Sequence, residues 1–332
     1  MSTITSHIIN KHMKRILVTG GAGFIGSNFC NINKDKYEVT ALDNLFLGDE
    51  SNLDPDIKFI KGDACKKEDL NKVGLIDYVI HLAGTSSAPM FMDDGFVDGY
   101  VNSIKSFVTT LEWARKNGAK RFLYASTSSL YGNNPLPLME NQHVTPINHY
   151  AVTKRTYEHC ARCYNKVYPE IDIIGFRFMS VYGPNEEAKG KFANLISQFC
   201  WDYARKRVPV IYGDGTQTRD FTNVKDVVRG LTLAIETDKK LGADVFNIGT
   251  GHSVSLNEIA EALEKAFDNG IKAKHIPNPV KEDYVKGQHA DISKIQKILG
   301  YEPKVKLEDG IKEQVENLRI NRIRETSSDE LR

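Results

Sequence analysis

Hydrophobic and polar positions divide the chain into short apolar runs that alternate with longer segments of helical periodicity. Continuous apolar runs of about four to eight residues are typical of strands buried on both faces. Such runs predict strands at residues 15–19, 37–42, 57–60, 77–82, 121–125 and 171–176. Helical periodicity predicts helices at residues 24–33, 97–117 and 150–168. This alternation predicts an α/β fold with a doubly wound parallel sheet, because parallel strands need right-handed crossover connections.

The first predicted strand runs directly into a glycine-rich turn, TGGAGFIG at residues 19–26. Gly20 permits a tight turn, Gly23 lets the backbone approach a pyrophosphate, and Gly26 lets the next helix lie close to the strand. The N-terminus of that helix offers N–H groups and a positive dipole end to the phosphates. Asp43 follows the second predicted strand, about 20 residues further on, where a carboxylate binds ribose hydroxyls and repels a 2′-phosphate. We therefore predict a Rossmann-type site for NAD rather than NADP.

The pattern changes after Gly183 and Pro184, where polar loops increase and the predicted elements become shorter. Glycine-rich turns also become frequent, as at residues 213–215 and 249–251. We therefore expect a smaller, mixed α/β C-terminal substrate lobe that caps the carboxyl edge of the sheet. The expected organisation is an N-terminal extension (1–12), a Rossmann-type NAD-binding domain with the catalytic residues (13–182), a mainly substrate-binding lobe (183–320) and a polar tail (321–332).

The composition of the 332-residue chain favours neither nucleic acid nor a membrane as its main partner. Its 44 basic and 43 acidic residues give a net charge of +1, and 41% of the residues are hydrophobic. No apolar run approaches the length of a bilayer span, and residues 1–14 lack the apolar core of a signal peptide. An odd count of five cysteines without such a signal favours reduced thiols and a cytoplasmic location. Cys160 and Cys163 form a C-x-x-C within a predicted helix, but without a second ligand pair we expect no metal site.

Tyr150 and Lys154 form a Tyr-x-x-x-Lys pattern at the start of a predicted helix, where residues four apart share one face. A tyrosine has an ordinary pKa of about 10, and an ammonium group one turn away stabilises the phenolate and lowers that pKa. The hydroxyl residues 126–129 end the preceding predicted strand, beside the expected nicotinamide end of the cofactor. This pattern indicates a tyrosine that acts as a general acid and base, with a lysine that also holds the ribose.

Motifs in a fixed order give the chain a resemblance to the extended short-chain dehydrogenases/reductases, specifically to the NAD-dependent nucleotide-sugar epimerases and dehydratases. The motifs are TGGAGFIG (19–26), LDN (42–44), GD (62–63), HLAG (81–84), ASTSSLYG (125–132), HYAVTK (149–154), RFMSVYGP (177–184) and GDGTQTRDFTNVKDVV (213–228). The segment ADISKIQKILGYEP (290–303) fits the family too, so the resemblance covers roughly residues 14–315.

The resemblance implies roles for individual residues. Thr127 matches the catalytic Ser/Thr of the family, Tyr150 matches the acid/base, and Lys154 matches the partner of that tyrosine. The positions that match NAD-binding residues are Gly20, Gly23, Phe24, Ile25, Gly26, Asp43, Asn44, Asp63, Leu82, Ala83, Asn102, Tyr150 and Lys154. The positions that match substrate-binding residues are Ser87, Thr127, Ser180 and Arg219. The arginine falls where a fork of N–H donors grips the nucleotide diphosphate.

Three departures from the family pattern bear on the reaction and the substrate. The 4,6-dehydratases carry Asp-Glu directly after the catalytic Thr, and nucleotide-sugar decarboxylases usually keep that Glu. Ser128 and Ser129 stand there instead, and because serine is no base at neutral pH, they favour epimerisation. Ser180 replaces the usual Asn of galactose epimerases, whereas UDP-glucuronate 4-epimerases often have a small hydroxyl residue at that position. PVKEDY (279–284) replaces a common Arg-x-Gly-Asp, which leaves both the base and the sugar open.

The resemblance therefore implies an NAD-dependent nucleotide-sugar 4-epimerase that acts on a UDP-hexose, such as UDP-glucose or UDP-galactose, through a transient 4-keto intermediate. The alternatives are a UDP-glucuronate 4-epimerase, another nucleotide-sugar epimerase, dehydratase, decarboxylase or reductase, and a catalytically silent NAD-binding regulator. The complete Thr–Tyr–Lys set argues against the silent regulator. A homodimer is also implied, since family members pair their two long helices into a four-helix bundle. The candidate contact stripe at helical spacing is Tyr157, Cys160, Ala161 and Tyr164.

Overall fold

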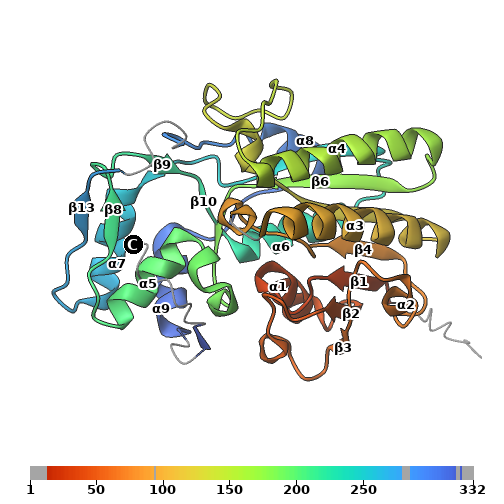
Figure 1. Cartoon of the computed structure of the whole chain (residues 1–332), viewed down its shortest axis with the longest axis horizontal. Helices are drawn as coiled ribbons and strands as arrows, with labels where there is room; N and C mark the ends of the chain where they lie inside the picture. The colour runs from red at the N-terminus through yellow and green to blue at the C-terminus, as the bar shows by residue number, and fades with distance from the viewer. Residues whose placement is uncertain (1–12, 93–94, 279–284, 319–321, 324–332) are drawn as a thin grey trace, which may run out of the picture.

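A computed structural model describes residues 13–92, 95–278, 285–318 and 322–323. A seven-stranded parallel sheet with the order β11-β6-β5-β4-β1-β2-β3 forms its centre (Figure 1). The strands are β1 (Arg15–Thr19), β2 (Glu38–Asp43), β3 (Lys58–Lys61), β4 (Tyr78–His81), β5 (Arg121–Thr127), β6 (Asp172–Phe178) and β11 (Ala243–Ile248). The predicted extension 1–12 lies outside the described residues, as does nearly all of the predicted tail.

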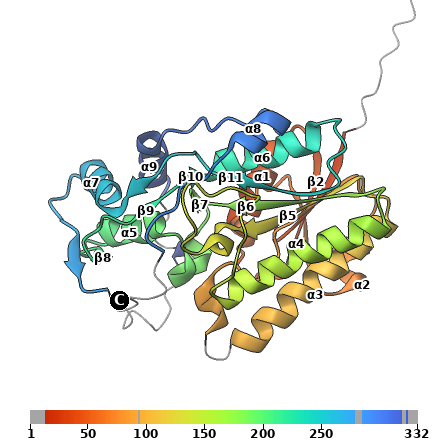
Figure 2. The ribbon, with the colours of Figure 1, turned by 90° about the horizontal axis from the view of Figure 1, so that it is seen from above.

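Helices cover both faces of this sheet, as Figure 2 shows. One face is covered by α1 (Phe24–Asn33), α6 (Val224–Glu236) and α8 (Ser293–Leu299), and the other by α2 (Lys67–Leu70), α3 (Gly95–Lys116) and α4 (His149–Val167). Each face buries its own apolar cluster against the strands. The predicted doubly wound α/β sheet is therefore confirmed.

Two strands extend further than their apolar runs predict. β5 continues to Thr127 and β6 to Phe178, and these two residues are partners in the parallel pairing. Backbone hydrogen bonds between neighbouring strands keep the chain extended, so polar side chains at the end of β5 still belong to the strand. Thr127 therefore stands at the carboxyl edge of the sheet, where ligands bind in doubly wound folds.

The second half of the chain builds a smaller lobe and also returns to the sheet. The lobe contains α5 (Leu195–Ala204), α7 (Leu256–Phe267) and α9 (Leu307–Glu316), with an apolar cluster of its own. Short strand pairs accompany them: β7 (Ser180–Tyr182) with β10 (Phe221–Asn223), β8 (Val210–Tyr212) with β13 (Lys274–Ile276), and β9 (Thr218–Arg219) with β12 (Val254–Ser255). Edge strand β11, with α6 and α8, belongs to the Rossmann layers although it follows residue 182. Sequence order therefore does not separate the two parts cleanly.

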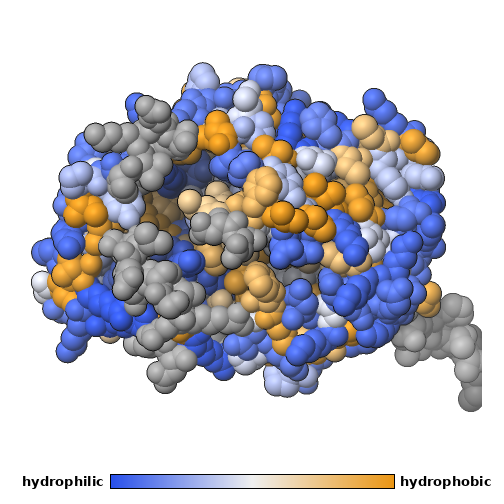
Figure 3. All heavy atoms as spheres, viewed as in Figure 1, coloured by the Kyte–Doolittle hydropathy of each residue, from blue (hydrophilic) through white to orange (hydrophobic). Residues whose placement is uncertain are grey.

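Two of the four residues of the predicted contact stripe on α4 are buried inside the subunit. Tyr157 and Ala161 are each only 1% exposed, and the Tyr157 ring stacks on Phe107 of α3 with 4.2 Å between ring centres. The prediction is therefore wrong for Tyr157 and Ala161, which pack against α3 and the sheet, whereas Cys160 and Tyr164 are half-buried. The large apolar side chains that these two helices do expose are Phe96, Val97, Val101 and Val108 on α3 and Val152 and Val167 on α4. Figure 3 shows hydrophobic residues among polar ones on the surface over α3 and α4.

No helix in the described ranges is both long and apolar enough to cross a membrane.

Candidate active site

The glycine-rich turn between β1 and α1 has the backbone that a pyrophosphate site needs. Gly20 has a φ of +70°, and a Cβ there would lie 2.8 Å from the backbone nitrogen of Ala83. A Cβ on Gly26 would lie 2.1 Å from the carbonyl oxygen of Gly20, so only glycine permits this approach of helix and turn. Gly23 precedes the first turn of α1, and a Cβ there would meet only the Gly20 oxygen within 4 Å. The cradle therefore fits a dinucleotide.

Asp43 lies at the end of β2, next to this turn, and is only 6% exposed. One carboxylate oxygen accepts a hydrogen bond from the backbone nitrogen of Ala22 at 3.1 Å, and the other accepts one from Leu45 at 2.7 Å. The carboxylate therefore holds the glycine turn in place, which is a structural role beyond the ribose contact that the sequence predicts.

The structure brings together the three residues predicted to be catalytic. Thr127 ends β5, and its hydroxyl oxygen accepts a hydrogen bond from the backbone nitrogen of Ser129 at 3.1 Å. Tyr150 and Lys154 lie in the first turns of α4, which begins after Asn148, the side chain of which accepts a hydrogen bond from the Ala151 nitrogen. The Lys154 ammonium group lies 5.7 Å from the centre of the Tyr150 ring. A partly exposed phenol therefore stands between a hydroxyl and a buried amine.

Burial away from solvent changes the pKa values of Tyr150 and Lys154. Burial raises the pKa of Tyr150 to about 12, and a hydrogen bond with Thr127 opposes that rise. Burial lowers the pKa of Lys154 to about 7, so its ammonium is only partly charged near neutral pH. The net shift of the tyrosine pKa in the protein alone is therefore upward, opposite to the lowering that the sequence analysis expects. A further positive charge beside the phenol is needed to bring its pKa toward neutrality.

Gln288 is a residue at this edge of the sheet that the sequence analysis missed. Its side-chain nitrogen donates to the Ser128 hydroxyl at 2.7 Å, and its side-chain oxygen accepts from the Ser180 hydroxyl at 2.9 Å. Gln288 thus joins the residue after Thr127 to the predicted substrate residue at the start of β7. It lies in an extended segment without periodicity, so no sequence pattern indicates it, and its burial, at 8% exposure, is evident only in the folded chain.

Ser87 is the one predicted substrate residue whose hydroxyl lacks a partner among the described residues. It precedes the short helix η2 (Ala88–Phe91), and its oxygen is buried without a hydrogen bond. A buried hydroxyl without a partner is costly, and a ligand hydroxyl could satisfy it.

The remaining predicted residues lie at strand ends, on helices α1 and α3, and in the smaller lobe. Leu82 and Ala83 follow β4, and their backbone packs on Gly20; Phe24 and Ile25 open α1. Asp63 follows β3 and accepts a hydrogen bond from the Cys65 nitrogen at 2.8 Å. Asn44 and Asn102 are exposed, and Asn102 lies on α3. Arg219 lies on β9 of the smaller lobe, where its guanidinium donates to the Thr218 carbonyl at 2.8 Å.

The family model described as "NAD dependent epimerase/dehydratase family" matches residues 16–249. The chain belongs to this family. The assignment confirms NAD as the cofactor and the prediction of an NAD-dependent enzyme. The match spans the glycine turn, Asp43 and the Thr127–Tyr150–Lys154 set, as well as β11 at the far edge of the sheet.

The chain is similar in sequence and structure to several proteins named as UDP-sugar 4-epimerases. A putative UDP-glucose 4-epimerase of Methanocaldococcus jannaschii is 32% identical over 311 residues, which cover 92% of this chain and 99% of that protein. The structure of UDP-glucose 4-epimerase from Thermotoga maritima with UDP-glucose is 32% identical, with a TM-score of 0.84 and 91% and 98% of the two chains covered. The structure of UDP-glucuronic acid 4-epimerase from Bacillus cereus with UDP-glucuronic acid and NAD is 30% identical, with a TM-score of 0.80 and the same coverage. The chain is thus similar to UDP-sugar 4-epimerases along almost its whole length.

The position of Asp43 generates a prediction about cofactor choice. Asp43→Ala should narrow the preference for NAD over NADP by about tenfold or more, because a carboxylate next to a 2′-phosphate places like charges together. Both cofactors should also bind more weakly, since Ala22 and Leu45 lose an acceptor. The measurement is the ratio of the two dissociation constants. Asp35→Ala, at an exposed acid in the turn before β2, should leave the ratio unchanged. A wild-type protein that binds both cofactors equally would contradict this role of Asp43.

Proposed function

We propose that the protein is a UDP-sugar 4-epimerase, acting on a UDP-hexose such as UDP-glucose or UDP-galactose. The observation that carries this proposal is the complete Thr127–Tyr150–Lys154 set. Two serines directly follow Thr127, where dehydratases have an acid pair. A base near C5 is what elimination of water would need, and neither Ser128 nor Ser129 is such a base at neutral pH. Similarity to structures with UDP-glucose and UDP-glucuronic acid supports a UDP-sugar.

The residues of this chain would handle the protons and the position of the sugar. When bound, NAD supplies hydride transfer to and from C4 and, in its oxidised form, a positive charge. The Tyr150 phenolate accepts the proton of the C4 hydroxyl, and Thr127 holds that hydroxyl by a hydrogen bond. Lys154 binds the ribose and favours the phenolate. After the sugar turns in the site, Tyr150 would return the proton to the C4 oxygen while C4 regains its hydride on the opposite face, which gives the C4 epimer.

The substrate would be held at its two ends by different parts of the chain. Arg219, on the smaller lobe, has the planar fork of donors that a diphosphate requires. Ser87 offers a buried hydroxyl without a partner among the described residues to the sugar. Because Arg219 would hold the substrate by its diphosphate, the sugar could rotate in the site, and a C4 epimerase needs this rotation.

A second candidate, a UDP-glucuronate 4-epimerase, is favoured by the polar groups near the end of β5. Ser128, Gln288 and Ser180 form a chain of hydroxyl and amide groups there. Such groups suit a sugar carboxylate as well as a hydroxymethyl group. Turnover of UDP-glucuronate compared with UDP-glucose distinguishes the two candidates.

The reaction can be tested by incubating the protein with UDP-glucose, UDP-galactose, UDP-glucuronate and UDP-N-acetylglucosamine in deuterated water. We expect one of these sugars to give its C4 epimer, with unchanged mass and without deuterium at C4, C5 or C6. NMR and mass spectrometry of the products give the readout. A 4-keto-6-deoxy product would show a dehydratase, and a product lighter by carbon dioxide would show a decarboxylase; either would overturn the proposal.

We also propose a homodimer formed through α3 and α4. The exposed apolar side chains Val97, Val101 and Val108 recur along α3, and the exposed Val152 lies on α4. A second copy of the same helix pair would cover them in a four-helix arrangement.

Light scattering at micromolar concentration should give twice the chain mass for the wild type. Val101→Glu should shift the protein toward the monomer, because it places a charge in an apolar contact. Val208→Glu, at a similarly exposed valine of the smaller lobe, should leave the dimer intact. A monomeric wild type would refute the proposed dimer.

A further inference from the structure

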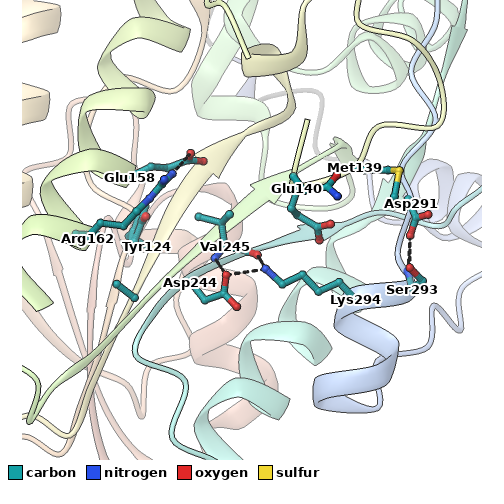
Figure 4. A pocket seen from close by; sticks show the side chains of 13 residues that line it. Tyr124, Met139, Glu140, Glu158, Arg162, Asp244, Val245, Asp291, Ser293 and Lys294 are labelled. Carbon is teal, nitrogen blue, oxygen red and sulfur yellow. Dashed lines mark hydrogen bonds and ion pairs between the residues drawn. The ribbon is translucent and has the colours of Figure 1, made fainter. Parts of the chain in front are cut away.

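A cavity of about 400 Å³ lies beside edge strand β11, on the face of the sheet that α4 covers (Figure 4). Its walls come from β5, α4, the segment 139–141, β11 and the beginning of α8. None of the residues predicted to bind NAD or the sugar lines it. Its volume falls in the range of small-molecule sites.

Small residues create the space of this cavity. Gly175 on β6 lies beneath the Tyr124 ring, and a Cβ there would lie 2.6 Å from the tyrosine hydroxyl oxygen. Ala161 of α4 and Ala243 of β11 line the walls. A larger side chain at Gly175 would displace the ring, so glycine at this position allows the tyrosine to lie across β6.

The Tyr124 side chain is buried, lines the cavity and lacks a hydrogen-bond partner. It is 1% exposed, and in the part of the chain that the structure describes its hydroxyl makes no hydrogen bond. Burial raises the pKa of this phenol well above its ordinary value, so it stays protonated and can donate or accept a hydrogen bond. The side chain lines the cavity, so a ligand there could make a hydrogen bond with this hydroxyl.

Four carboxylates line the cavity, and two of them already have cations. The Glu158 carboxylate binds the Arg177 guanidinium at 2.8 Å, and Asp244 binds the Lys294 ammonium at 2.6 Å. Glu140 and Asp291 make no ion pair with any described residue, and each uses one carboxylate oxygen for hydrogen bonds. Glu140 accepts from the Asn247 nitrogen at 2.8 Å, and Asp291 accepts from the Ser293 nitrogen at 2.8 Å. Arg162 and Lys294 also line the cavity, so its lining holds four carboxylates against two cationic side chains.

We propose that this cavity binds a small organic cation, specifically a linear aliphatic amine. Its ammonium groups would bind the carboxylates of Glu140 and Asp291, and its N–H groups would also reach the Tyr124 hydroxyl. Charged hydrogen bonds to carboxylates are the stronger class of such contacts. A flexible chain of a few methylene groups fits a cavity with alanines and the Met139 side chain in its walls.

Calorimetric titration of the full chain with 1,4-diaminobutane at pH 8 and low ionic strength tests this proposal. We expect saturable binding at one site, with the same affinity when NAD is present in excess. Glu140→Gln with Asp291→Asn should weaken binding about tenfold or more, because both replacements keep the shape and remove the charges. Tyr124→Phe should weaken it by a smaller factor. Glu261→Gln, at an exposed acid on α7, should leave the affinity unchanged.

Absence of saturable binding by the wild type would overturn the proposal. Equal affinity in the double variant would do the same, provided that its thermal unfolding matches that of the wild type. Competition by NAD would show that the amine binds in the cofactor site instead. Inorganic phosphate serves as the probe of opposite charge. Tighter binding of phosphate than of the amine would show that Arg162 and Lys294 make the cavity a site for anions, and would overturn the proposal. Failure of the amine to bind would leave the proposed epimerase reaction unaffected, since that reaction is read from its products.

Discussion

The buried ion pair between Glu158 and Arg177 fixes helix α4 on the sheet. Two parallel hydrogen bonds of 2.8 Å join the carboxylate to the guanidinium of β6, and the exposures of the two side chains are 0% and 1%. Burial would raise the pKa of Glu158, but the bonds with Arg177 outweigh burial and lower it. The same carboxylate accepts a hydrogen bond from Ser126, the residue before Thr127. Tyr150 and Lys154 precede Glu158 on one helix face, so this pair sets their position relative to the end of β5.

Burial shifts the pKa values of Tyr150 and Lys154 in the directions that disfavour their charged forms. The pKa of Tyr150 is about 12 and that of Lys154 about 7, both as a result of desolvation. A positive charge beside the phenol stabilises the phenolate, and the effect is larger in a dry site than in water. The proposed chemistry therefore depends on the cofactor for its electrostatics as well as for its hydride transfer.

The sequence predicted the parts of the fold that local pattern determines. Apolar runs predicted the positions of the six strands up to β6 in a parallel sheet, and Tyr-x-x-x-Lys predicted which side chains share a face of α4. It could not predict contacts between distant segments. Gln288 reaches Ser128 from 160 residues away, and no periodicity marks it. The stripe through Tyr157 had helical spacing, but spacing alone cannot say whether a helix face meets the core or another subunit, and here it meets the core. Desolvation, which reverses the expected shift of the Tyr150 pKa, also requires the folded chain.

The central claim is that the Tyr150 hydroxyl carries the proton transfer, and turnover by Tyr150→Phe tests it most directly. The comparison is made with the wild type on the UDP-sugar that the wild type epimerises, and with Tyr164→Phe, a matched loss of a hydroxyl further along α4. The account predicts that Tyr150→Phe binds NAD and unfolds like the wild type but loses activity about 10²–10⁴-fold, the usual contribution of general acid–base catalysis. Tyr164→Phe should keep its activity. Retention of most of the activity by Tyr150→Phe would contradict the account.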